Sequence, residues 1–287
     1  MRFVCDPPHT FGSLHPAQLR SGATVRDMPR QRLDTLLAER GAFSSRTAAA
    51  AAVRAGEVQL GHDGPFALRP SQLVEPEADL IVADGPRYVS RGGIKLQNAL
   101  EAFEIDVAGR DCLDVGASTG GFSDCMLQHG AARVAAVDVA HGELDWGLRN
   151  DPRMTVIERL NARSLEPADL PFVPSLATVD VSFISLTKVL PAVAEALSED
   201  GEVLALVKPQ FELGREKVGK GVVRDPALRR AALALVAEAA GSLGLAVRGI
   251  ASSGLAGPKG NRESFLWCSR EGESLGDVEA AIDEVES

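Results

Sequence analysis

A glycine-rich turn at residues 114–121 constrains the fold of this chain more than any other stretch. The apolar run 111–115 leads into the turn, and a helix-like segment follows it. A strand, a tight glycine turn and a helix start together open a βαβ unit. A second apolar run, 133–138, ends in Asp138, where nucleotide-binding folds hold a ribose diol. The turn therefore predicts an α/β fold that binds a nucleoside-containing ligand.

The spacing of the glycines indicates which ligand. A dinucleotide fingerprint reads Gly-x-Gly-x-x-Gly, whereas here Asp114 precedes Gly116 and the pair Gly120-Gly121 follows. A carboxylate at this turn disfavours pyrophosphate and suits a ligand with an ammonium and a sulfonium group. The pattern resembles the first motif of S-adenosylmethionine-dependent methyltransferases; the alternative is an ordinary strand–helix loop. The predicted cofactor-binding residues are Asp114, Gly116, Ala117, Ser118, Gly120, Gly121, Phe122, Asp138 and Asn161.

Strands and helices alternate after the turn. Four successive strand-like runs end at or beside a charged residue: Asp114, Asp138, Asp180 and Lys208. The alternation predicts a mostly parallel sheet covered on both faces, which binds ligands at the carboxyl ends of its strands. One charged strand end is commonplace, but four in succession indicate a site. The predicted strands span residues 111–115, 133–138, 155–158, 177–181, 202–208, 245–251 and 264–269.

The charge of the chain is unevenly distributed. The formal net charge of −10 argues against a nucleic-acid partner only if the acidic residues are spread evenly. Residues 271–287, which we expect to form an acidic C-terminal tail, hold seven acidic residues and no base, so the rest carries −3. Residues 26–54 hold six arginines against three acidic residues. Charges beyond a Debye length of about 8 Å are screened, so the acidic total does not exclude RNA.

Other features bear on location and processing. No apolar run approaches the roughly 18–20 residues of a membrane span, and the five histidines form no ligand cluster. We therefore expect no membrane partner and no metal. Cys112 and Cys268 lie in apolar runs, which favours buried free thiols in a reducing cytoplasm. Residues 1–27 lack a signal-peptide pattern; we expect a disordered extension, or translation starting at Met28.

Residues 28–86 are predicted to form a small basic α+β module and a linker. Two short helical patterns, each followed by glycine, precede a short strand. The segments Arg32-Leu33-Asp34, Ser45-Arg46 and Ala55-Gly56-x-Val58 resemble the RNA-binding module named for ribosomal protein S-four. The alternative is a helical cap on the catalytic domain. The predicted RNA-binding residues are Arg30, Arg32, Arg46 and Arg54, with Arg91, Lys217 and Lys220 beyond the module.

Five segments together resemble the TlyA family of rRNA 2′-O-methyltransferases, some of which are called hemolysins. They are Ser90-Arg91-Gly92-Gly93-x-Lys95-Leu96, Asp114-Val115-Gly116, Asp180-Val181-Ser182-Phe183-Ile184-Ser185-Leu186, Lys208-Pro209-Gln210-Phe211-Glu212 and Gly260-Asn261-Arg262-Glu263. The resemblance implies a Rossmann-like, FtsJ-like methyltransferase domain over 87–270. It also implies S-adenosylmethionine as cofactor, rRNA or ribosomal subunits as partner, and cytidine as target. The family's tetrad corresponds to Lys95, Asp180, Lys208 and Glu263.

Ribose methylation suits that tetrad chemically. A 2′-hydroxyl is a poor nucleophile until a base takes its proton, and Lys208 is the predicted base. A lysine accepts a proton only as the neutral amine, which burial and a second nearby ammonium favour. Gly92-Gly93 is expected to mark a special backbone before Lys95. Residues 215–221 are expected to form an RNA-facing lid or, equally, a solvated loop.

Several alternatives stay open at this point. The tetrad could be a structural ion-pair network, and the chain could be an RNA-binding ribosome-assembly factor without turnover. An amino-group methyltransferase is disfavoured because residues 180–183 lack the two expected prolines. A nicotinamide oxidoreductase would need a different glycine spacing. A pore-forming hemolysin would need a spanning segment or a cationic amphipathic helix, and neither is evident.

Overall fold

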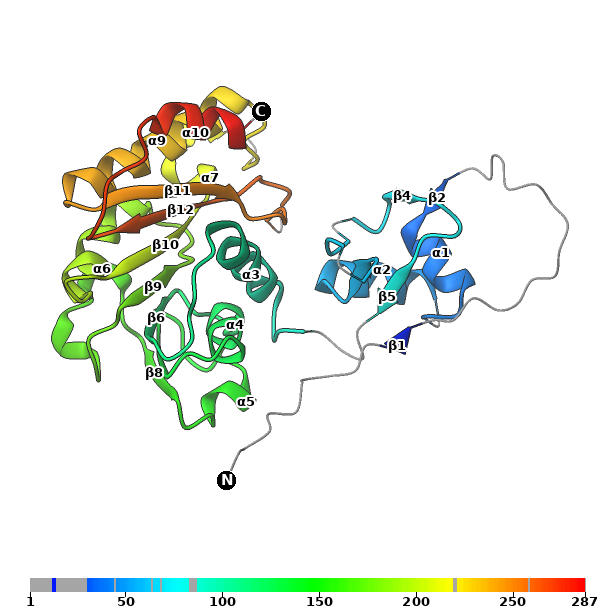
Figure 1. The fold of residues 1–287 in the computed structure, drawn as a ribbon, viewed down its shortest axis with the longest axis horizontal. Coiled ribbons are helices and arrows are strands. Elements are labelled where there is room, and N and C mark those ends of the chain that lie inside the picture. Colours follow the sequence, from blue (N-terminus) through cyan, green and yellow to red (C-terminus); the bar gives the residue numbers. More distant parts are fainter. Residues whose placement is uncertain are drawn as a thin grey trace, which may run out of the picture. The chain divides into compact units, whose positions relative to one another are not determined.

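The computed structural model describes residues 12–13, 30–43, 45–62, 64–67, 69–82, 87–218, 221–257 and 259–286. The chain forms two compact units, Met1–Arg87 and Tyr88–Ser287 (Figure 1). Within the predicted N-terminal extension, only Gly12–Ser13 is described, as strand β1, which pairs with β5 (Leu80–Val82). Met28 and Lys220 lie outside the described residues, and the predictions made for them stay predictions.

The smaller unit packs two helices against short strands, as the periodicity predicts. Ser45 begins α2 by accepting a hydrogen bond from the Ala48 N–H, and Gly56 ends it at a φ of 77°. Apolar residues of both helices share one core with Val58 and Leu80. The elements are β2 (Gln31–Arg32), α1 (Leu33–Glu39), α2 (Arg46–Ala55), β3 (Val58–Leu60), β4 (Leu73–Val74) and β5.

The larger unit is built on a seven-stranded sheet of order β11-β12-β10-β9-β6-β7-β8 (Figure 1). The five strands from β10 to β8 run parallel, and β12 runs antiparallel to both β10 and β11. The prediction of a mostly parallel sheet is therefore confirmed. The strands are β6 (Asp111–Val115), β7 (Arg133–Asp138), β8 (Met154–Glu158), β9 (Leu176–Val179), β10 (Glu202–Val207), β11 (Ala246–Ser252) and β12 (Ser264–Ser269).

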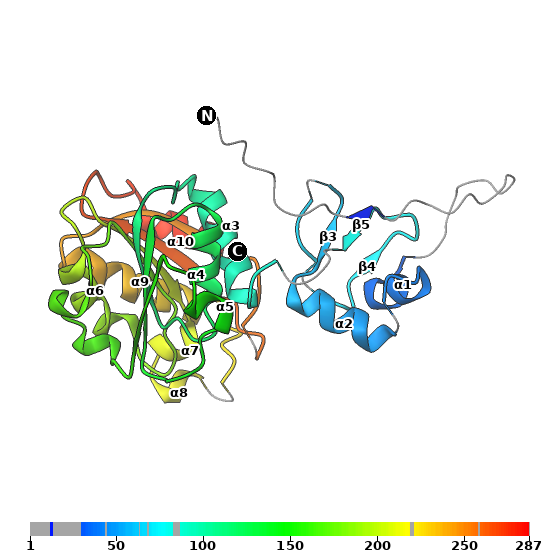
Figure 2. The same cartoon turned by 90° about the horizontal axis from the view of Figure 1, so that it is seen from below.

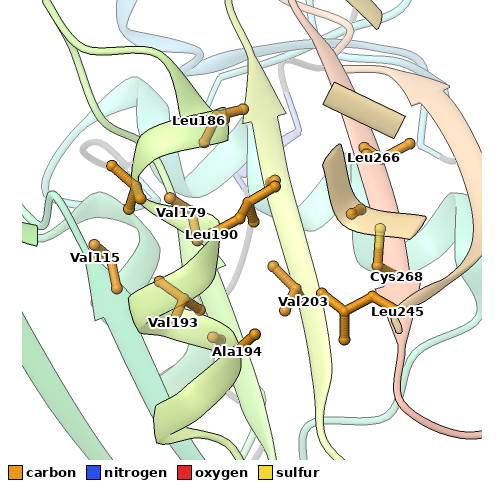
Figure 3. Close-up of a cluster of buried hydrophobic side chains, with 14 of the residues drawn as sticks. Val115, Val179, Leu186, Leu190, Val193, Ala194, Val203, Leu245, Leu266 and Cys268 are labelled. Carbon is orange, nitrogen blue, oxygen red and sulfur yellow. The ribbon is translucent and has the colours of Figure 1, made fainter. Parts of the chain in front are cut away.

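Helices cover both faces of the sheet. Side chains from alternate strand positions, such as Val115, Val179 and Val203, meet Leu190 and Val193 of α6 in a buried cluster (Figure 3). On the opposite face α3 and α4 pack side by side (Figure 2). Phe122 of α4 contacts Phe265 of β12 there. The helices are α3 (Arg91–Phe103), α4 (Gly121–Gln128), α5 (Trp146–Arg149), α6 (Leu190–Ala196), α7 (Pro209–Glu212), α8 (Arg215–Val218), α9 (Pro226–Ser242) and α10 (Val278–Val285), with 3₁₀ turns η1 (Ala162–Ser164), η2 (Pro167–Asp169) and η3 (Leu186–Lys188).

The acidic C-terminal segment is not the separate tail that the charge pattern predicted. Residues 278–285 form α10, which packs on α9 and β11. Ile282 is buried in the main core, and Glu286 forms a buried ion pair with Arg229 of α9. The prediction was wrong because it counted charges only, whereas an amphipathic helix buries its apolar side and one paired carboxylate.

The order of the parallel strands reverses between β6 and β9. From this point the chain continues outward through β7 and β8 on one side, and through β9 and β10 on the other. Open α/β sheets bind ligands in the crevice outside the strand ends at such a switch point. The loops after β6 and β9 therefore mark where a ligand is expected.

Candidate active site

The glycine turn after β6 is shaped by the segments packed around it. Gly116 has a φ of 86°, and a Cβ there would lie 2.7 Å from the Asp180 carbonyl oxygen. At Gly120 (φ 94°) a Cβ would lie 2.4 Å from Leu148 Cδ1. The loops after β6 and β9 can thus touch only because residue 116 has no side chain.

Two residues predicted to contact the ligand at this turn also hold the surrounding elements together. Asp114 is fully buried, and its carboxylate accepts hydrogen bonds from Ser123 N (2.9 Å), Ser123 Oγ (2.7 Å) and Thr178 Oγ1 (3.2 Å). It therefore ties the first turn of α4 to β6 and β9. Phe122 is buried against Phe265. Both residues also line the cavity described below, so their contact with the cofactor stays a prediction.

Burial of Asp114 predicts a pH dependence of stability. Loss of solvation raises the pKa of this carboxyl to about 7, with the nearby Asp180 carboxylate adding to the effect. With a raised pKa in the folded state, the free energy of unfolding falls as pH rises from about 4 towards 7. In this range the unfolded chain has released the proton of Asp114, whereas the folded protein still holds it. We expect Asp114→Asn to flatten this decline by up to about 4 kcal/mol. Denaturant unfolding between pH 4 and 8 measures it; parallel curves for both proteins would contradict it.

The two glycines before Lys95 serve packing, not an unusual backbone. Both lie inside α3, and neither has a positive φ. A Cβ at Gly93 would lie 2.2 Å from the Tyr88 ring, and one at Gly92 would lie 3.2 Å from Ser90 Oγ. The expectation of a special backbone was therefore wrong: these positions let Tyr88 and α4 approach α3 and so fix the helix that carries Lys95.

The four predicted catalytic residues form two ion pairs. Lys95 Nζ donates to Glu263 Oε2 at 2.6 Å, and both side chains are almost fully buried. Lys208 Nζ lies 2.5 Å from Asp180 Oδ1 and donates to the Val181 carbonyl oxygen at 3.0 Å. Asp180 and Lys208 lie just beyond β9 and β10, because each strand ends earlier than predicted.

Both lysines border one cavity. A cavity of about 280 Å³ contacts Lys95, Lys208 and Asp180 together with the glycine turn. Two cations and a carboxylate therefore converge beside the turn, at the carboxyl edge of the sheet. Among the other predicted residues, Arg91, Asp114, Gly116, Ala117, Ser118, Gly121 and Phe122 also line this cavity.

A larger groove of about 960 Å³ shares Asp180 and part of the glycine turn with this cavity, and it has room for a small-molecule cofactor. Asp138, Asn161 and Ser118 line it. The Asp138 carboxylate accepts from the N–H groups of Ser118 and Ala140, both at 2.7 Å. Each oxygen of a carboxylate has a second acceptor site, so Asp138 can still accept from ribose hydroxyls. These residues fit a nucleoside-containing cofactor.

An aromatic ring stands at the mouth of the groove. Phe183 is 91% exposed with a φ of 65°, and its ring centroid lies 5.2 Å from that of Phe211. Such a ring offers a flat apolar face to a planar group. The sequence motif contained Phe183, but only the structure shows that it is exposed.

The predicted RNA-binding residues of the smaller unit are partly engaged within it. Arg32 and Arg46 both pair with the buried Asp34, at 2.7 and 3.2 Å, which holds the pKa of that carboxyl well below its usual range. Arg30 pairs with Glu75 on the surface. These arginines stay partly exposed, so their contact with RNA remains a prediction. Arg54 and Lys217 lie on α2 and α8, outside the side chains that the structure describes.

Other expectations concern cysteines, metals and membranes. Cys112, Cys125 and Cys268 are buried free thiols, and burial raises the pKa of Cys112 and Cys268 to about 12. In the described part of the chain, no cluster of potential metal ligands is found. Nor does any helix there have the length and apolar character needed to cross a bilayer.

Comparisons with known proteins agree on one family. A family model described as FtsJ-like methyltransferase matches residues 88–270. The 16S/23S rRNA (cytidine-2′-O)-methyltransferase TlyA of Mycobacterium tuberculosis is 49% identical over 241 residues, covering 83% of this chain and 89% of that protein. The 23S rRNA (cytidine-2′-O)-methyltransferase TlyA of Campylobacter jejuni is 33% identical over 209 residues, covering 70% and 80%. A solved structure from Streptococcus thermophilus, provisionally named a hemolysin, is 41% identical with a TM-score of 0.68, covering 91% and 95%.

Proposed function

Because this chain belongs to the FtsJ-like methyltransferases, and within them to the TlyA family, we propose that it methylates the 2′-hydroxyl of a cytidine in ribosomal RNA. It is an S-adenosylmethionine-dependent methyltransferase. The observation that carries the proposed reaction is the convergence of Lys95, Lys208 and Asp180 on one cavity beside the glycine turn. Relatives that act on rRNA cytidine support the choice of substrate.

S-adenosylmethionine supplies the methyl group, and its sulfur keeps the electron pair of the bond that breaks. We propose that Asp138 accepts from the ribose hydroxyls of this cofactor and that Asn161 contacts the adenine. Both line the larger groove, together with Gly116 and Ser118.

Lys208 is proposed to take the proton of the 2′-hydroxyl while the hydroxyl oxygen forms its bond to the methyl carbon. The Nζ atom contacts a carboxylate, a carbonyl and the Ser182 hydroxyl, which are the partners of an ammonium. Lys208 must therefore release a proton before it can accept one. Asp180 orients this amine, while the Lys95–Glu263 pair is proposed to orient the nucleophile from the α3 side.

Phe183 supports a nucleotide substrate. Its exposed ring lies on the loop that carries Asp180, at the entrance of the groove. Aromatic side chains stack on unpaired bases with little sequence preference. A target nucleotide stacked there would bring its ribose close to the cavity between the two lysines.

The direct test is transfer of labelled methyl groups to isolated ribosomal subunits, followed by mass mapping of the modified nucleotide. We expect label on a cytidine ribose. Label on a base would contradict the proposed reaction. Binding of subunits without any transfer would favour the ribosome-assembly alternative.

Gly257→Ala is expected to disturb the Lys95–Glu263 ion pair, although neither of these two residues is replaced. A Cβ at position 257 would lie 2.2 Å from Glu263 Oε1, so the Glu263 carboxylate must shift from its position beside Lys95. A displacement of about 1 Å in a catalytic group can cost about 10²-fold in rate, which single-turnover methyl transfer would measure. Gly241→Ala, which meets nothing within 4 Å, is the control. Equal rates for both variants would show that the pair's position does not matter.

A further inference from the structure

We call residues 180–186, which follow β9, the exit loop. One short segment, residues 208–212, holds both ends of this loop. At its first end, Lys208 Nζ contacts Asp180 and donates to the Val181 carbonyl oxygen and to Ser182 Oγ, both at 3.0 Å. Four residues later, Glu212 holds the second end of the same loop.

Glu212 makes two hydrogen bonds to the exit loop. Its Oε2 accepts from Ser185 Oγ at 2.6 Å, and its Oε1 accepts from the Leu186 N–H at 3.0 Å. The residue is only 9% exposed, and burial raises the pKa of its carboxyl. Within the described residues Glu212 forms no ion pair. Burying a carboxylate without a cation is unfavourable, and the only compensation found here is its hold on the loop.

The middle of the exit loop is strained. Phe183, with its φ of 65°, adopts a backbone conformation that costs free energy for a bulky residue. Such a conformation persists only where the surroundings fix it. The Phe183 side chain is exposed and contacts the Phe211 ring. The constraint on the loop therefore comes from its neighbours: Val181 and Leu186 are buried in the main core, and hydrogen bonds hold the two loop ends.

We propose that Glu212 is a positioning residue for methyl transfer. By holding Ser185 and Leu186, it fixes the exit loop in the conformation in which Asp180 meets Lys208. Helix α7 begins directly after Lys208 and ends at Glu212, so one short segment carries both side chains that hold the exit loop. The catalytic consequence rests on the proposed function, whereas the effect on the loop does not.

The test compares Glu212→Ala with Glu212→Gln. In Glu212→Gln the side-chain carbonyl can still accept from Leu186 N, and the amide can donate to Ser185 Oγ. We expect Glu212→Ala to lower kcat by about 10- to 100-fold, with S-adenosylmethionine affinity by calorimetry within about threefold. Glu212→Gln should recover most of the rate. Glu195→Ala, an exposed glutamate on α6, should behave as the wild type.

Ser185→Ala gives an independent check, because it removes one of the two partners of Glu212. If the residues act as one unit, the double variant should lose little more rate than Glu212→Ala alone. Multiplicative losses would place the two residues in separate roles and overturn the proposal. So would a kcat for Glu212→Ala within threefold of the wild type.

Hydrogen exchange tests the effect of Glu212 on the exit loop independently of the methyl-transfer reaction. In Glu212→Ala, amides of residues 181–188 should exchange faster than in the wild type, and in Glu212→Gln they should not. Unchanged exchange in Glu212→Ala would overturn the proposal even if rRNA methylation is confirmed. Conversely, if the wild-type protein methylates no ribosomal RNA, the proposed function fails while the exchange result still reports on the loop.

Discussion

Lys208→Ala is expected to lower the rate of methyl transfer by about 10²- to 10⁴-fold, the usual contribution of a general base. The variant removes the only lysine that contacts Asp180 in the described structure, at the cavity shared with Lys95. Affinity for S-adenosylmethionine should change little, because the larger groove is lined by Asp138 and Asn161 and not by Lys208. Single-turnover transfer and calorimetry measure the two quantities separately.

Lys208→Arg distinguishes a base from a fixed positive charge. A guanidinium keeps the charge but is not deprotonated in proteins, so a base role predicts a loss as large as that of Lys208→Ala. Substantial activity in Lys208→Arg would instead assign Lys208 an electrostatic role. Abolished cofactor affinity in Lys208→Ala would contradict the proposed role altogether.

Arg229→Met is expected to destabilise the larger unit by about 3–5 kcal/mol, the usual effect of removing one partner from a buried ion pair. Arg229 of α9 pairs with Glu286 after α10, and both side chains are at most 5% exposed. Loss of the guanidinium leaves the Glu286 carboxylate buried, with Ser264 Oγ as its one remaining side-chain donor among the described residues. For a unit of this size the melting temperature should fall by about 6–20 °C.

A neighbouring pair provides the matched control. Arg230 and Asp283 also join α9 to α10, at 2.7 Å, but their side chains are 39% and 66% exposed. Exposed pairs contribute about 0–1 kcal/mol, so Arg230→Met should barely shift the thermal transition. Replacing Arg229 and Glu286 together by apolar residues should recover much of the lost stability. Equal losses in Arg229→Met and Arg230→Met would show that burial does not decide the effect.

Local pattern was enough to predict the larger unit of this protein. The hydrophobic periodicity of each strand and helix can be read within that segment alone. The alternation of these segments, with a glycine turn after the first strand, therefore predicts a parallel sheet. Charged residues at the strand ends, Asp138 and Lys208 among them, follow from the same rule, since parallel strands bring their carboxyl ends to one edge. The boundaries were less certain: β9 ended two residues before the prediction, which placed Asp180 in a loop.

Tertiary structure alone decided how those residues are used. Lys95 pairs with Glu263 across 168 positions, and Glu212 reaches back 26 or 27 positions to the exit loop. Asp114, which matches a cofactor motif, is buried and accepts two hydrogen bonds from Ser123 of α4. Sequence spacing cannot resolve such contacts, because they depend on which face of the sheet a side chain occupies and on which loops the switch point brings together. The acidic C-terminus shows the same limit: its charge is plain in the sequence, but its docking on α9 depends on a partner in three dimensions.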